Sequence, residues 1–96
     1  MKYTVRVGVV CRWTGITDEI REIPVNSGKE AQKVVMDFYN KECFENWQFL
    51  GGELKDKNGT TLGIFNQIGL FFGTQNEGNE YYEKLPDNSI KLPIPA

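Results

Sequence analysis

The chain has 96 residues, of which 40% are apolar and 25% are charged, so its length and composition are those of one small globular domain. Its formal net charge is −2, because 13 acidic residues outnumber 11 basic ones. This balance argues against a protein that holds nucleic acid by bulk electrostatic attraction.

Residues 3–25 predict the first hairpin of a sheet. Apolar residues recur at every second position along 3–13, which puts one set on a single face of an extended chain: Tyr3, Val5, Val7, Val9, Cys11 and Trp13. A loop through Thr14 and Gly15 leads to a second strand over 20–25. Pro24 suits a strand at a sheet edge, where not every backbone amide is needed.

A helix is predicted from Ser27 to Cys43. Glu30 follows Ser27 at the spacing of a capping box, in which each side chain accepts a hydrogen bond from a free backbone amide at the helix start. Apolar residues then recur at helical spacing, so one side of the helix should face the core, at Ala31, Val34, Val35 and Phe38.

Residues 47–55 and 60–72 predict two further strands. The dipeptide Asn58-Gly59 lies between them, and Asn-Gly between strand residues indicates a hairpin with a type I′ turn, in which both central residues have positive φ. The adjacent glycines Gly51-Gly52 suggest a bulge in the third strand.

The order ββαββ predicts an α+β fold with a four-stranded antiparallel sheet and one helix packed on one face. We expect this ββαββ domain to occupy residues 1–72. Residues 73–96, a polar loop followed by an apolar, proline-containing tail, are expected to belong to the same single domain. The residues expected to be nearly inaccessible are Val7, Val9, Ile23, Val35, Phe38, Leu62 and Ile64.

The residue types that most enzymes use are missing or wrongly spaced. The sequence has no histidine, which removes the commonest general base and the commonest transition-metal ligand. Cys11 and Cys43 lack CxxC spacing and are expected to be buried free thiols without activation. The stretch GGELKDKNGTT resembles a phosphate-binding loop, but Thr60 follows Gly59 where that loop needs lysine. We therefore expect a protein that is not an enzyme, with no catalytic residues, cofactor or metal.

The segment 60–72 is apolar at both strand parities, and this carries the prediction of a partner. One helix covers only one face of a sheet, so the tail, a second copy of the chain or a different protein should cover the other. Aromatic residues near the tail would supply anchors for docking. We predict a partner-binding surface made of Phe71, Phe72, Tyr81, Tyr82, Ile90, Leu92 and Ile94.

These features predict a non-enzymatic protein-binding module, with another protein as partner and a homodimer as one arrangement. The alternative is a small single-stranded nucleic-acid-binding domain, although nucleic acid is not the expected partner. Lys2, Arg6 and Arg12 share the polar face of the first strand, and aromatic residues on a sheet can stack on bases. The aromatic residues considered for stacking are Trp13, Trp47, Phe71 and Phe72.

The stretch "YTVRVGVV" followed by "REIPVNSGKEAQKVVMDFYNK" places a strand, a strand and a capped helix in close succession. Over residues 3–41 this order resembles small proteins encoded by phages and mobile elements, anti-CRISPR proteins among them. The resemblance carries no residue-level motif, so it transfers no site. It implies stoichiometric inhibition of a host defence or regulatory protein, in the host cytoplasm if the protein is phage-encoded.

The start of the chain interleaves charged with apolar residues, unlike a secretory signal, and no apolar run has the length of a membrane span. We therefore expect a cytoplasmic protein without a membrane partner.

Overall fold

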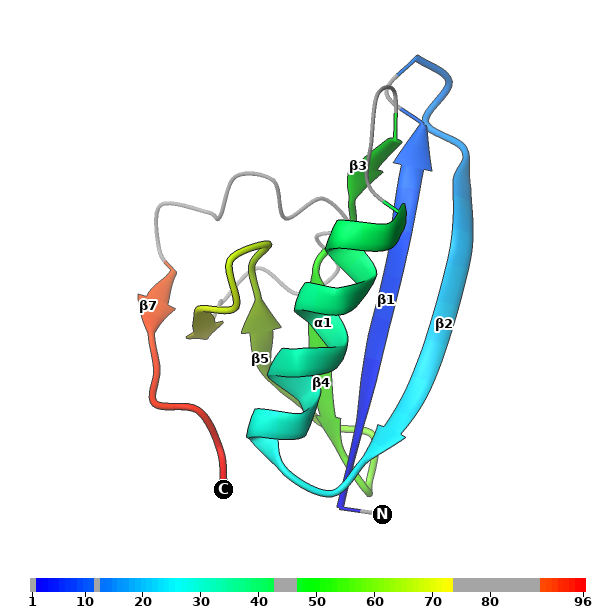
Figure 1. The fold of residues 1–96 in the computed structure, drawn as a ribbon. Coiled ribbons are helices and arrows are strands. Elements are labelled where there is room, and N and C mark those ends of the chain that lie inside the picture. The colour runs from blue at the N-terminus through cyan, green and yellow to red at the C-terminus, as the bar shows by residue number, and fades with distance from the viewer. Residues whose placement is uncertain (1, 12, 43–46, 74–88) are drawn as a thin grey trace.

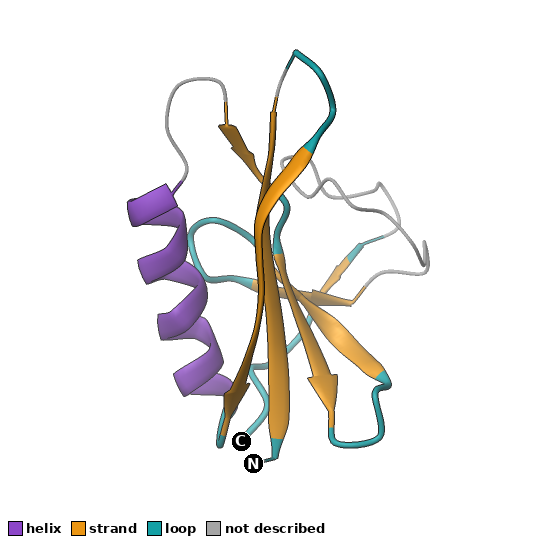
Figure 2. Ribbon diagram, turned by 90° about the vertical axis from the view of Figure 1, so that its right-hand side faces the viewer, coloured by secondary structure: helices purple, strands orange, loops and turns teal. Residues whose placement is uncertain are grey.

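The computed structural model describes residues 2–11, 13–42, 47–73 and 89–96, which form an antiparallel sheet with a helix on one side (Figures 1 and 2). All strand pairs among these residues are antiparallel, so the predicted α+β class with a helix on one sheet face is confirmed. In chain order the elements are β1 (Tyr3–Cys11), β2 (Thr17–Val25), α1 (Gly28–Glu42), β3 (Trp47–Phe49), β4 (Gly52–Asp56), β5 (Thr61–Phe65), β6 (Phe71–Gly73) and β7 (Ile90–Lys91).

The sheet is six strands wide rather than four, and within the described part of the chain its order is β2-β1-β4-β5-β6-β7. β3 and β4 both pair with β1, so they are two parts of the predicted third strand. They are separated at Leu50-Gly51, where Gly51 has a φ of 99°. The interruption lies beside the predicted bulge. The extra width comes from residues 60–72, which form two strands, and from the tail.

The predicted single strand over 60–72 is wrong because the chain turns back at Asn66. The Gly69 amide donates to the Asn66 carbonyl oxygen at 3.0 Å, and the Asn66 side chain accepts hydrogen bonds from the amides of Ile68 and Leu70 at 3.1 and 2.9 Å. Gly69 has a φ of 85°, a conformation that favours glycine. Ile68 therefore lies in an exposed turn rather than in a strand.

The hairpin tip at Asn58-Gly59 is present, but the predicted turn type is wrong. The Gly59 amide donates to the Asp56 carbonyl oxygen at 3.1 Å, and the Asp56 carboxylate accepts hydrogen bonds from the amides of Asn58 and Thr60. Gly59 has a φ of 84°, whereas Asn58 does not have positive φ. This geometry is that of a type I turn followed by a left-handed glycine. The turns at 56–59 and 66–69 therefore share one pattern, in which Asp56 or Asn66 is followed three residues later by a glycine with positive φ.

The start of α1 follows the prediction closely. The Ser27 hydroxyl accepts a hydrogen bond from the Glu30 amide at 3.1 Å, which makes Ser27 the N-cap. The Glu30 carboxylate accepts a hydrogen bond from the amide of Asn26 at 2.8 Å, one residue before the usual capping-box position. The helix extends to Glu42, and Cys43, its predicted last residue, lies outside the described residues.

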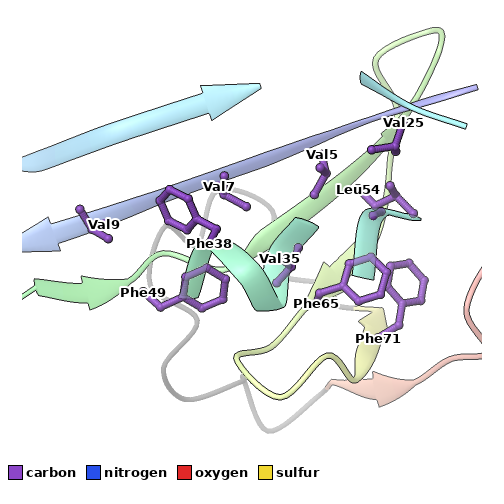
Figure 3. Packing of buried hydrophobic residues seen from close by; sticks show 11 residues of the cluster. Val5, Val7, Val9, Val25, Val35, Phe38, Phe49, Leu54, Phe65 and Phe71 are labelled. Carbon is purple, nitrogen blue, oxygen red and sulfur yellow. The ribbon is translucent and has the colours of Figure 1, made fainter. Parts of the chain in front are cut away.

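The core lies between α1 and the sheet (Figure 3). Phe38 and Tyr39 of the helix contact Phe49 of β3, with ring centroids 6.3 and 5.6 Å apart. Phe65 and Phe71 form a second ring pair at 4.8 Å between β5 and β6. The buried members of the cluster are Val5, Val7, Val9, Val25, Ala31, Val35, Phe38, Phe49, Leu54, Phe65 and Phe71.

Two of the seven predicted core residues are less buried than expected. Ile23 is half-buried, and Leu62 is 36% exposed. Leu62 is displaced by a register shift, because Leu54 pairs with Gly63 whereas Lys55 pairs with Thr61. The other five predicted core residues are confirmed as buried: Val7, Val9, Val35, Phe38 and Ile64.

Candidate functional site

The tail, residues 89–96, folds back onto its own domain. β7 adds to the edge of the sheet, with Ile90 opposite Gly73 and Lys91 opposite Phe72. The Leu92 amide then donates to the Phe71 carbonyl oxygen at 2.9 Å. Beyond Leu92 the chain runs toward the first turn of α1 (Figure 1), and the C-terminal end lies beside the start of β1 (Figure 2).

The end of the tail is held by α1 and β1 together. The amide of Gly28, the first residue of α1, donates to the Pro95 carbonyl oxygen at 3.1 Å. The Tyr3 hydroxyl donates to the Ala96 carbonyl oxygen at 2.9 Å. Leu92 and Ile94 are half-buried and pack against the core. The tail thus closes the core at the end where α1 begins.

The structure places five of the seven predicted partner-binding residues on β6 and the tail, and their exposures differ. Phe71 is buried in the core, and Phe72, Leu92 and Ile94 are half-buried. Ile90 is the exposed member. The other two residues, Tyr81 and Tyr82, lie outside the described residues.

The two apolar parities of β5 separate onto the two faces of the sheet. Phe65 lies in the core under α1, so its neighbour Ile64 points to the opposite face, where it is also buried. Leu92 and Ile94 pack on the α1 side. On the face away from α1 the tail places Lys91, an exposed residue opposite Phe72, which in turn lies opposite Ile64.

A second apolar surface lies at the far end of the sheet, and its tryptophans were considered above for stacking on bases but not as a protein-binding surface. Trp13, predicted on the core face, is 76% exposed in the loop between β1 and β2, and Ile16 is 64% exposed. The Cys11 amide donates to the Ile16 carbonyl oxygen at 2.8 Å, and Cys11 lies opposite Trp47. Directly opposed residues share a face, so Ile16, Cys11 and Trp47 form one row. We call Trp13 and this row the tryptophan end.

Trp13 and Ile16 are exposed because the sheet is longer than the helix, whereas Trp47 is half-buried and packs against the core. The neighbouring row, Val9 with Phe49, is the one that the rings of Phe38 and Tyr39 cover. Figure 1 shows β1 and β2 continuing beyond the end of α1. The predicted lengths already differed, since the predicted 11-residue strand over 3–13 spans ~36 Å and the predicted 17-residue helix only ~25 Å. Comparing the two lengths would have shown that part of the strand lacks a helical cover.

The Cys11 thiol differs from the predicted buried, unactivated thiol. Cys11 is a half-buried free cysteine. A hydrogen bond with the Thr14 side chain lowers its pKa, and hydrogen bonds with the backbone of Thr14 and Trp13 act in the same direction. The Thr14 hydroxyl also accepts a hydrogen bond from the Ile16 amide at 3.2 Å, which holds it in place. The tryptophan end therefore carries a thiol with increased thiolate character.

Alkylation of Cys11 should become half-maximal at a lower pH in the folded protein than in denaturant. The thiolate is the reacting form, and a lowered pKa makes it available at lower pH. Iodoacetamide labelling across a pH series, followed by mass spectrometry of the tryptic peptides 7–12 and 42–55, separates Cys11 from Cys43. Thr14→Val should move the midpoint upward. A folded midpoint equal to that in denaturant would contradict the assigned hydrogen bonds.

Arg6 and Lys55, on the face away from α1, lie beside acidic residues. Arg6 lies opposite Glu22 in β2 and Glu53 in β4. Lys55 forms ion pairs with the same two carboxylates, at 3.9 and 3.3 Å. Of the residues considered for nucleic-acid binding, Trp13 and Trp47 lie in the tryptophan end, Lys2 lies ahead of β1 at the other end of the sheet and Phe71 lies in the core, whereas Arg12 lies outside the described residues.

Comparison of the chain with family models, curated proteins and solved structures gives no match. Among the described residues, no group of three or more His, Cys, Asp or Glu side chains is placed to hold a metal ion. No helix in the described part of the chain has the length and apolar character to cross a membrane. The two surfaces, the tail and the tryptophan end, are therefore the features that bear on function.

Proposed function

We propose that this protein is a non-enzymatic protein-binding module, and that it acts by covering a surface of its partner. The observation that carries the proposal is the tryptophan end. Large apolar side chains clustered on a surface mark interaction sites, and tryptophan is among the residues that contribute most to binding energy. Trp13 and Ile16 are not members of the buried core cluster, so packing among the described residues does not account for their apolar surface.

The order of elements over residues 3–41 supports a particular kind of module. A strand, a strand and a capped helix in succession resemble small inhibitors encoded by phages and mobile elements. On this proposal the partner is a host defence or regulatory protein, bound stoichiometrically in the host cytoplasm. The tryptophan end would then be the part that enters an apolar depression on the partner.

The test is to compare binding by three full-length proteins. Trp13→Ala with Ile16→Ser removes the exposed apolar groups of the tryptophan end, whereas Ile68→Ser removes an isoleucine that is equally 64% exposed but lies in the β5–β6 turn. A partner captured by the parent, with protein and nucleic acid scored separately, is purified and titrated by calorimetry. We expect the double variant to bind ~30-fold more weakly or worse, and Ile68→Ser to bind as the parent does.

Equal binding by the parent and the double variant would contradict the assignment to the tryptophan end. Capture of single-stranded nucleic acid in place of protein, with affinity falling steeply as salt rises, would favour the nucleic-acid-binding alternative.

A further inference from the structure

The contacts of the tail are those by which a separate peptide adds to a sheet. β7 extends the sheet beside β6 through backbone pairing, and alternate side chains, Leu92 and Ile94, pack against the core. Recognition by strand addition uses this division, in which the backbone supplies affinity and alternate side chains supply specificity. The tail therefore occupies its position as a ligand segment would.

Two glycines on the surface that receives the tail leave room for it, Gly28 for the backbone of Pro95 and Gly73 for the side chain of Leu92. A Cβ atom on Gly28 would overlap the Pro95 carbonyl oxygen, and a Cβ atom on Gly73 would lie 2.9 Å from Leu92 Cδ1. Neither glycine has positive φ, so backbone conformation does not require glycine at either position. At Gly28 the requirement is steric and comes from the Pro95 backbone, whereas at Gly73 the near atom is the end of the Leu92 side chain, which can shift. We call Gly28, Tyr3 and β6 the tail-binding surface.

The chain between β6 and β7 is longer than docking within one molecule requires. Gly73 and Ile90 lie opposite each other, and two residues suffice to join such a pair. The sequence provides 16 residues, 74–89, whose contour length when extended is ~50 Å. The longest dimension of the domain is 36 Å. The tail is thus long enough to reach the tail-binding surface of another molecule.

We propose that the tail-binding surface is a strand-acceptor site whose ligand in trans is the tail of a second copy of this chain. The tail of the second copy fits the tail-binding surface because it has the same sequence as the chain's own tail. It therefore makes the same contacts between two molecules as the tail makes within one. Attachment gives the chain's own tail an effective concentration of about 1 mM. At micromolar concentration the parent protein is therefore a monomer, and exchange appears when the contact in cis is broken.

The test mixes two full-length variants that fail in complementary ways. Gly28→Val blocks the acceptor and leaves the tail intact, whereas Leu92→Asp with Ile94→Asp breaks the tail and leaves the acceptor open. Neither variant can make the full set of contacts with its own tail. We expect native mass spectrometry of the concentrated mixture to show a 1:1 heterodimer, and each variant alone to remain monomeric.

In the matched control, Gly28→Val is mixed with a triple variant that carries Gly28→Val, Leu92→Asp and Ile94→Asp. This mixture should form no heterodimer, because neither protein has an open acceptor. Circular dichroism checks that each protein is folded. If one is not, two milder variants are used instead: Gly28→Ala for the acceptor, and Leu92→Ala with Ile94→Ala for the tail. Folded variants that form no heterodimer at concentrations approaching the effective concentration would overturn the proposal. Dimerisation of either variant alone would also overturn it, because exchange is impossible there.

Discussion

Replacing Phe38 by alanine is expected to lower the free energy of unfolding by about 3–5 kcal/mol. Phe38 is 5% exposed, its ring lies 6.3 Å from that of Phe49, and the Arg21 guanidinium lies 5.5 Å from its centroid. Truncation removes these contacts and leaves a cavity where α1 meets the sheet. A domain of this size has ~5–15 kcal/mol of total stability, so the loss should be visible in a thermal melt and in urea.

The control for Phe38→Ala is Met36→Ala, on the same helix. Met36 is 38% exposed, so its truncation should cost less than ~1 kcal/mol. If Phe38→Ala melted within a few degrees of the parent, the assignment of Phe38 to the core would be incorrect.

Deleting residues 90–96 is expected to lower the free energy of unfolding by ~2–4 kcal/mol. The deletion removes the half-buried side chains of Leu92 and Ile94 and the hydrogen bonds from the Leu92 and Gly28 amides. It also uncovers part of the core beside Phe71. Urea denaturation measures the loss as a lower midpoint.

Two substitutions test whether the stability comes from the docked contacts of the tail rather than from the presence of the segment. Lys91→Ala changes an exposed side chain in the same segment and should leave the urea midpoint unchanged. Gly28→Ala, which puts a methyl group against Pro95, should reproduce part of the loss. An unchanged midpoint after the deletion would show that the tail contributes nothing to the core.

The two surfaces lie at opposite ends of β1 and should be separable in experiments. Tyr3, which holds the tail, and Cys11, in the tryptophan end, are eight residues apart along an extended strand, or ~26 Å. Effects of substitutions at such separated sites usually add. Loss of binding at Trp13 with normal docking of the tail, or the reverse, would therefore be interpretable.

The sequence predicted the features whose signals are local. Ser27 and Glu30 mark the start of α1 because a cap depends on residues within one turn. The hairpin tip at Asn58-Gly59 was located, but its turn type was not, because Asp56 supplies the side chain that selects it. The turn at Asn66 was missed although Asn66 and Gly69 repeat the spacing of Asp56 and Gly59. Apolar residues on both sides concealed it within an apparent strand.

What the sequence determined by itself is the α+β class, the capped helix and the alternation that puts Val5, Val7 and Val9 in the core. The tertiary structure alone decided the width of the sheet, the exposure of Leu62 and the position of the tail. The physical reason is the separation along the chain of the residues that interact. Caps and alternation arise between near neighbours, whereas strand register, the reach of α1 along the sheet and the close approach of Pro95 to Gly28 depend on residues far apart in the chain.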